Sequence, residues 1–121
     1  MKCISDEDYL DILRFLQDAV GIIKEDNERI RQIVGDNKNL DLSDKRADEA
    51  LMKMSNVKAA TTLTDEQYWT VKDVVSLAMS YFKVELDEHL KLFDKDAFII
   101  ECDKRDYDQA VKAYEIMEEI R

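Results

Sequence analysis

The sequence predicts an all-α protein, an antiparallel helical bundle of about four helices in which residues 1–121 form a single domain. The chain contains no proline and only two glycines, so it lacks the turn formers on which β-sandwiches and barrels depend. Apolar residues recur every three or four positions in several long segments. Hydrophobic residues make up 45% of the chain and charged residues 38%, which is enough to build one core and to keep the protein soluble.

The first helix is expected to run from a cap at Ser5 to a left-handed stop at Gly35. Its apolar positions alternate in steps of three and four, namely Tyr9, Ile12, Leu16, Ala19, Ile23, Ile30 and Ile33. This pattern is broken only where Asp26 takes an expected apolar place. Because residues 24–29 are almost wholly charged or amide, the far end of the helix is expected to project beyond the bundle or to bend at Gly21.

Residues 36–42 have the composition of a turn and no apolar period, so they are expected to form a loop. Ser43 then caps a second helix. Its apolar positions are Ala47, Leu51, Met54, Val57 and Lys58 or Ala60. This inward face is narrow and made of small residues, which is typical of a helix on the outside of a core.

A central helix is predicted over residues 64–93, where it supplies most of the core. Thr64 and Gln67 have capping-box spacing, and Leu63 and Tyr68 are placed to form a hydrophobic staple across the box. The start of this helix is therefore well defined.

The central helix carries only a thin polar stripe. Its members recur every three or four positions among apolar residues, namely Asp73, Ser76, Ser80, Lys83, Asp87 and Lys91. A helix with so thin a stripe is expected to be covered by other helices on most of its circumference, with Val75 and Phe82 facing the core.

Residues 97–100 could form a short strand, a helical turn or the start of one long final helix. We expect helix for the segment 94–102, because a lone strand would have no partner to pair with. Asp106 and Gln109 repeat the capping spacing, and an apolar arc then continues to the C-terminus. Its apolar arc is broad, comprising Tyr107, Ala110, Val111, Ala113, Tyr114, Ile116, Met117 and Ile120. This helix is expected to lie inside the bundle or at an interface.

The formal net charge of −10 bears on the partners of the protein. Such a field repels nucleic-acid phosphates and anionic lipids, so we expect no direct binding of nucleic acid or membrane. The N-terminal residues are acidic, and no apolar stretch approaches the roughly eighteen residues of a membrane span, which predicts a cytoplasmic protein. Cys3 and Cys102 lack the paired spacing of a zinc site and are expected to be free thiols.

His89 is the only histidine, and it lies within one helical turn of Glu85 and Glu88. A metal centre needs further donors from other segments, and the sequence singles out none. His89 is therefore expected to be solvated.

Acidic pairs at helical spacing raise a second possibility. All-α nucleotide pyrophosphohydrolases hold Mg²⁺ with acidic pairs on neighbouring helices. The pairs with this spacing here are Glu25 and Glu28, Asp41 and Asp44, Glu85 and Glu88, and Asp103 and Asp106. Such pairs arise freely by chance among 28 acidic residues, so no catalytic, cofactor-binding or metal-binding residue is predicted.

The expected function is that of a non-enzymatic acidic interaction protein that docks on a basic surface of a partner protein. An inhibitor, an immunity protein or an anti-defence antagonist, acting for example on a nucleic-acid-handling protein, fits this description. The alternative is a structural or assembly subunit whose apolar excess closes a homodimer or larger homo-oligomer. A magnesium-dependent pyrophosphohydrolase is the third hypothesis. Aromatic residues that suit either an interface or the core are Tyr9, Tyr68, Trp69, Tyr81, Tyr107 and Tyr114.

Overall fold

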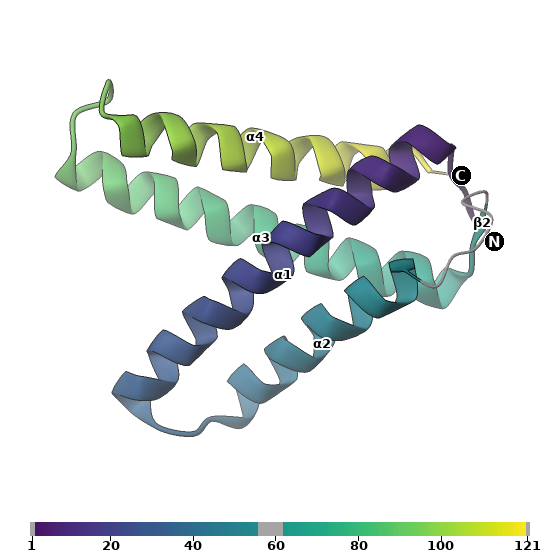
Figure 1. Ribbon diagram of the computed structural model, residues 1–121, viewed down its shortest axis with the longest axis horizontal. Coiled ribbons are helices and arrows are strands. Elements are labelled where there is room, and N and C mark those ends of the chain that lie inside the picture. Colours follow the sequence, from purple (N-terminus) through teal and green to yellow (C-terminus); the bar gives the residue numbers. More distant parts are fainter. Residues whose placement is uncertain (1, 56–61, 121) are drawn as a thin grey trace.

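The computed structural model describes residues 2–55 and 62–120, and within them it confirms the predicted all-α bundle. The elements in chain order are β1 (Lys2–Cys3), α1 (Asp6–Val34), α2 (Lys38–Ser55), β2 (Thr62–Leu63), α3 (Asp65–Leu92) and α4 (Phe98–Glu119). Helices α1 and α2 form one helical hairpin, α3 and α4 form a second, and the first hairpin lies across the second (Figure 1). The two chain ends lie close together, beside the start of α3 (Figure 1).

The predicted helix ends of α1 and α3 are confirmed. Ser5 Oγ accepts a hydrogen bond from the backbone N–H of Asp8 at 3.1 Å, and Gly35 ends α1 with a φ of 81°. At α3, the backbone N–H of Gln67 donates to Thr64 Oγ1 at 3.1 Å, while the Gln67 side chain accepts from the Thr64 N–H at 2.8 Å. These local bonds pair backbone groups that a helix end leaves without a partner.

Helix α1 is continuous through Gly21, and its far half lies against α2. Lys24 Nζ lies 3.1 Å from Asp48 Oδ2, which is one of several polar contacts between the two helices. The expected break at Gly21 is therefore absent, and the far end of α1 extends away from α3 and α4 together with α2 (Figure 1).

The predicted loop over residues 36–42 is also wrong, since α2 begins at Lys38. Asn37 Oδ1 accepts a hydrogen bond from the backbone N–H of Asn39 at 2.8 Å and so caps the helix. Ser43, the expected cap, lies inside α2. Asparagine and aspartate favour both turns and helix starts, which is why composition alone suggested a loop. The predicted apolar positions Val57, Lys58 and Ala60 lie outside the described residues.

The sequence analysis missed a short antiparallel pairing of β1 with β2, in which Lys2 lies opposite Leu63 and Cys3 opposite Thr62. Strands of two residues are too short to show a period. In the segment 94–102, the backbone N–H of Ala97 bonds to the carbonyl of Asp94 in a turn, and α4 then begins at Phe98. The helix expected for this segment is therefore confirmed from Phe98 on, as the start of one long final helix, and the capping spacing at Asp106 and Gln109 does not mark a helix start.

The core lies where the two hairpins cross. The largest fully buried side chains come from all four helices and β2, and they are Ile12, Leu16, Met54, Leu63, Val71, Val75, Ile100 and Met117. Val75 and Phe82 are buried as predicted. Within the described part of the chain, no helix combines the length and the hydrophobicity needed to cross a membrane.

The enclosure of α3 is less complete than predicted. The polar stripe is exposed apart from the half-buried Ser76, but Leu77, Val84 and Leu90 beside it are exposed as well. The reason is the arrangement in two hairpins, which covers α3 with α4 along one flank and with α1 and α2 along another. The remaining face of the helix is left open.

Candidate functional site

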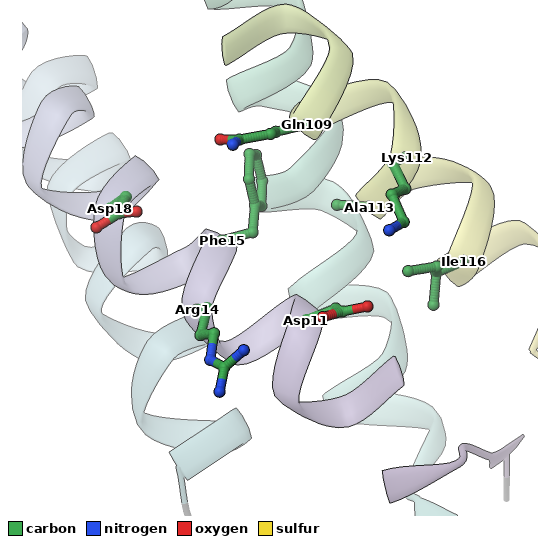
Figure 2. Close-up of a pocket in the computed structure, with 8 residues that line it drawn as sticks. All are labelled: Asp11, Arg14, Phe15, Asp18, Gln109, Lys112, Ala113 and Ile116. Carbon is green, nitrogen blue, oxygen red and sulfur yellow. The ribbon is translucent and has the colours of Figure 1, made fainter. Parts of the chain in front are cut away.

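A groove runs between α1 and α4 where the hairpins cross (Figure 2). Its first part has a volume of about 350 Å³, and its lining includes Asp11, Phe15 and Asp18 from α1 and Lys112 and Ile116 from α4. A second part, of about 280 Å³, shares Phe15 and Asp18 with the first. This part extends to Ile22 of α1, Phe82 of α3 and Asp106 of α4, so the groove joins three helices.

Phe15 and Phe82 form the apolar floor of the groove. Their rings meet edge to face, with centroids 6.4 Å apart. Figure 2 shows the Phe15 ring directed from α1 toward Gln109 on α4. The wall on α1 alternates between carboxylates and apolar groups, because residues 11, 15, 18 and 22 recur at three- and four-residue spacing and share one helical face.

Tyr81 marks the continuation of this surface between α1 and α3. Its hydroxyl donates a hydrogen bond to Glu85 Oε1 at 2.8 Å. Burial raises the pKa of Tyr81, and the bond to Glu85 and the negative charge of Asp26 on α1 raise it further. Asp26 therefore acts across the gap between the two helices.

Asp106 shows that the carboxylates of α1 and α4 are close enough to repel one another. Burial raises the pKa of Asp106, and the negative charges of Asp103 and Asp18 add to this effect against the opposing charge of Arg105. Ionisation of Asp106 is therefore less favourable in the folded protein than in water, which is common where a charge serves a ligand or partner.

We name this surface the acidic groove and define it by its carboxylates and the apolar groups between them. The carboxylates are Asp18, Asp26, Glu85, Asp103 and Asp106, and the apolar groups are Phe15, Ile22, Tyr81 and Phe82. They come from α1, α3 and α4. The hairpin crossing brings Asp18 close to Asp106, whereas Glu85 and Asp103 meet at His89 within the hairpin of α3 and α4.

His89 borders the acidic groove. It was predicted to be solvated, but its ring contacts two carboxylates instead. Its Nδ1 lies 2.6 Å from Asp103 Oδ2, and its Nε2 lies 3.5 Å from Glu85 Oε2. The hydrogen bond to Asp103 raises the pKa of His89, and the charges of Glu85 and Glu88 add to the shift, although burial opposes it. The imidazole therefore joins α3 to α4 with a charge-assisted contact.

The contribution of His89 to stability is expected to depend on pH. Because its pKa is higher in the folded than in the unfolded protein, the stabilisation is complete below the unfolded value of about 6.5 and disappears as the pH rises through the folded value. His89→Gln keeps a hydrogen-bonding group but not the charge. Thermal unfolding followed by circular dichroism should show a midpoint lowered by about 3 °C at pH 5.5, and by less than about 1 °C at pH 9. An equal or larger loss at pH 9 would contradict this assignment.

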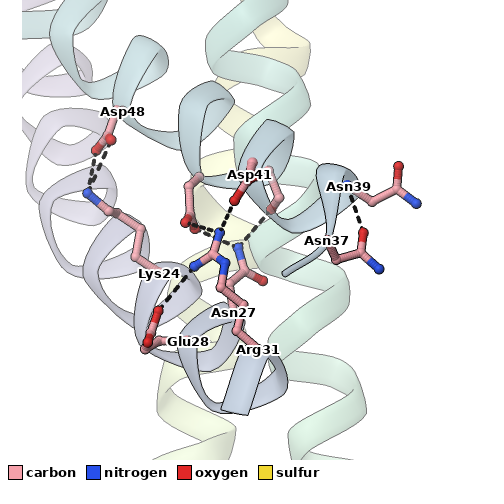
Figure 3. A network of polar contacts seen from close by, with 10 residues as sticks. Lys24, Asn27, Glu28, Arg31, Asn37, Asn39, Asp41 and Asp48 are labelled. Carbon is pink, nitrogen blue, oxygen red and sulfur yellow. Dashed lines mark hydrogen bonds and ion pairs between the residues drawn. The ribbon is translucent and has the colours of Figure 1, made fainter. Parts of the chain in front are cut away.

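The acidic residues around Arg31, near the C-terminal end of α1, join α1 to α2 (Figure 3). Arg31 lies 2.6 Å from Asp44, 2.9 Å from Asp41 and 3.3 Å from Glu28. The hydrogen bond to Asp44 is the main cause of a raised pKa of Arg31. Burial opposes the ionisation of Asp44, but hydrogen bonds from Asn27 and Arg31 hold its pKa below the usual value. The pair Asp41 and Asp44 therefore fastens α2 to α1.

The remaining candidates for a metal site are dispersed. Glu25 is exposed, and Glu88 pairs with Lys91 at 3.2 Å. Among the described residues, no group of three or more histidine, cysteine, aspartate or glutamate side chains is placed to hold a metal ion. Cys3 and Cys102 are free thiols, as predicted.

Two of the aromatic residues singled out by the sequence serve the core. The Tyr9 hydroxyl donates to the carbonyl of Met54 at 2.8 Å, and the Tyr68 hydroxyl donates to the carbonyl of Met117 at 2.9 Å. Both tyrosines are buried, and each joins the two helices of one hairpin.

Other aromatic residues pack around lysines. Lys72 Nζ lies within cation–π distance of the rings of Tyr68, Trp69 and Tyr114. Lys83 lies over the ring of Tyr107 in the same way. Of the six aromatics, Tyr81 is the one that belongs to the acidic groove.

The sequence analysis singled out part of the acidic groove, but as possible metal ligands and not as a docking surface. Glu85, Asp103 and Asp106 stood out as members of acidic pairs, whereas Asp18 was not noticed. Asp26 carried a usable signal, because it takes an apolar place in the pattern of α1. An acid on the inward face of a helix often marks a functional position.

Comparison of the chain with protein-family models, with curated proteins and with solved structures finds no match. The chemistry of the acidic groove is therefore the basis for the function proposed next.

Proposed function

We propose that this chain is a non-enzymatic interaction protein that docks through its acidic groove on a basic surface of a partner protein, as an inhibitor, immunity protein or antagonist does. The observation that carries the proposal is the approach of Asp18 from α1 and Asp106 from α4 at the edge of the Phe15 and Phe82 floor. A lysine or arginine placed there would offset the mutual repulsion of Asp18, Asp103 and Asp106.

The net charge of −10 supports the same proposal. Long-range electrostatic attraction steers a strongly acidic protein toward basic surfaces and raises the rate of association. Surfaces that bind nucleic acid are characteristically basic. A nucleic-acid-handling protein of the cytoplasm is therefore the partner class that we favour.

A homo-oligomeric structural subunit is the second candidate. The observation in its favour is the exposed outer face of α3. Leu77, Ser80 and Val84 follow steps of three and four on this face, and both apolar side chains are exposed. Sedimentation at micromolar concentration separates the two candidates. A dimer that dissociates in the double variant Leu77→Ser/Val84→Ser would favour the structural subunit.

Titration against a panel of basic nucleic-acid-handling proteins tests the main proposal. We expect saturable binding to at least one of them that weakens about tenfold or more between 50 and 200 mM salt. Asp18→Asn/Asp106→Asn should weaken binding, whereas the control Glu101→Gln/Asp108→Gln, which removes the same charge from exposed positions of α4 outside the groove, should not. Absent binding, or binding that ignores salt, would refute the proposal.

A further inference from the structure

We propose that the partner element seated in the groove between α1 and α4 is an amphipathic α-helix of another protein, with a basic edge that faces α1 and an acidic edge that faces α4. This inference rests on the proposed function and specifies the docking element of the partner. It is carried by the opposite charge of the two rims of the groove, by the absence of pairing between them, and by the apolar floor that separates them.

The α1 rim of this groove is acidic. Asp11 and Asp18 both line its first part, and Asp18 lines the second part as well. Arg14 lies between them in the chain, but Figure 2 shows its guanidinium directed away from α4. A cation placed along this rim would therefore meet two carboxylates.

The α4 rim carries the opposite charge. Its residues follow steps of four, three and four along one helical face, and they are Arg105, Gln109, Lys112 and Ile116. The last three line the first part of the groove, and Arg105 adjoins Gln109 and Lys112 on the neighbouring surface of α4. Asp106 adds a carboxylate only in the second part of the groove. An anion placed along the α4 rim of the first part would therefore meet positive charge.

The charges of the two rims do not neutralise each other. Four charged side chains of the rims form no ion pair or hydrogen bond with any residue that the structure describes, namely Asp11, Asp18, Arg105 and Lys112. Opposite charges on α1 and α2, by contrast, do pair directly. The groove thus keeps apart two charged rows that a third element lying between them could contact.

Charge complementarity specifies both edges of the occupant. Lysine or arginine facing α1 would pair with the carboxylates of that rim, and aspartate or glutamate facing α4 would pair with Arg105 and Lys112. Apolar side chains between the two edges would pack on the floor of the groove, where the Phe15 and Phe82 rings meet. Charged positions beside the apolar seam of a coiled coil select partner and orientation in the same way.

The two rims favour a helix over an extended strand. Each rim extends over eleven residue steps, from 11 to 22 on α1 and from 105 to 116 on α4, which corresponds to about 17 Å or three helical turns. A helix can carry an apolar row with a charged row on either side, and its ridges pack between those of other helices. A strand directs successive side chains to opposite faces, so it presents one row to the groove and cannot meet both rims.

Two synthetic peptides of about 14 residues, each with leucine on one face of a helix, test this inference. The mixed peptide carries lysine along one edge of that face and glutamate along the other, whereas the basic peptide carries lysine along both edges. The net charge of −10 attracts the basic peptide more strongly. We nevertheless expect the mixed peptide to bind about fivefold more tightly at about 0.15 M salt, where distant charges are screened and contacts at the rims decide. Calorimetric titration of the full chain measures both affinities.

Reversing the charge of the α4 rim should reverse this preference. Arg105→Glu/Lys112→Glu should bind the basic peptide about fivefold more tightly than the mixed peptide. The control Lys38→Glu/Lys45→Glu makes the same change of net charge on α2, away from the groove, and should still prefer the mixed peptide. Because every protein is compared with the same two peptides, the helix propensities of the peptides do not affect the reversal. All four replaced side chains are exposed, and thermal unfolding verifies that the fold is intact.

The outcomes separate this inference from the function on which it rests. Basic peptide that binds at least as tightly as mixed peptide, or a preference that is unchanged in Arg105→Glu/Lys112→Glu, would overturn the helix with two charged edges and leave docking on a basic surface standing. Failure of both peptides to bind would overturn it as well. A dimer of the free chain that this variant dissociates would make a second copy the occupant, against our assignment to another protein. If no basic protein binds either, the proposed function itself fails.

Discussion

Phe82→Ala is expected to lower the free energy of unfolding by about 3–5 kcal/mol, the usual cost of removing a buried phenylalanine side chain. Phe82 is 8% exposed and lies where α1, α3 and α4 meet. Its ring packs edge to face on Phe15, so the substitution removes the main aromatic contact between the two hairpins as well as buried area. Urea unfolding followed by circular dichroism measures the change.

Phe98→Ala is the matched control, because it makes the same chemical change at the start of α4, where the side chain is 79% exposed. We expect its effect to stay within about 0.5 kcal/mol. Equal losses in the two variants would mean that the hairpins are not held together at the crossing. A small loss of stability in Phe82→Ala would mean that the Phe82 ring is not packed between the hairpins. Phe82 would then not form part of the floor of the acidic groove.

The fold was predictable where local signals and the apolar period agree. The caps at Ser5 and Thr64 and the stop at Gly35 each depend on residues within a few positions of the helix end, so the sequence contains all the information needed. The start of α2 was not predictable in this way. Asn37 favours a turn and a cap equally, and the hydrogen bond from Asn27 to Ser43 joins the first turns of α2 to α1, sixteen positions earlier in the chain.

The extent of burial around α3 was less predictable than its position. Apolar residues such as Val84 and Leu92 suggested a helix covered on nearly all sides, but a folded protein retains much apolar surface. Which face is covered depends on how the hairpins cross, and that is set by the fit of many side chains. The excess apolar residues instead stay exposed on the face of α3 that the other helices leave uncovered.

The acidic groove was predictable only in parts. Glu85 and Asp103 were visible as members of acidic pairs, but their shared contact with His89 bridges two helices and has no signature in local spacing. Asp18 and Asp106 lie 88 positions apart in the chain and become neighbours only through the crossing. The local sequence pattern predicts each helix, but it does not predict the contacts between the two hairpins that form part of the candidate site.

The contact of α1 with α2 leads to the second large expected effect. Asn27 is buried, although it lies in a segment that composition marks as polar, and its Nδ2 donates to Asp44 at 2.8 Å and to Ser43 at 3.2 Å. Arg31 also binds Asp44, at 2.6 Å. Asn27→Asp keeps the shape of the side chain but replaces the donor with a second carboxylate. At pH 7 we expect a loss of about 2–3 kcal/mol in the free energy of unfolding.

This loss should decrease as the pH falls. Two carboxylates at hydrogen-bonding distance raise the pKa of one of them above the unfolded value of about 3.9, so the penalty is complete above the raised pKa and disappears as the pH falls through it. Urea unfolding of both proteins at pH 7 and pH 4.5 gives the difference at each pH. Asn39→Asp is the matched control, since Asn39 is exposed in the first turn of α2, where an added negative charge is neutral or slightly stabilising. A loss in Asn27→Asp that is unchanged at pH 4.5 would show that repulsion from Asp44 is not its cause.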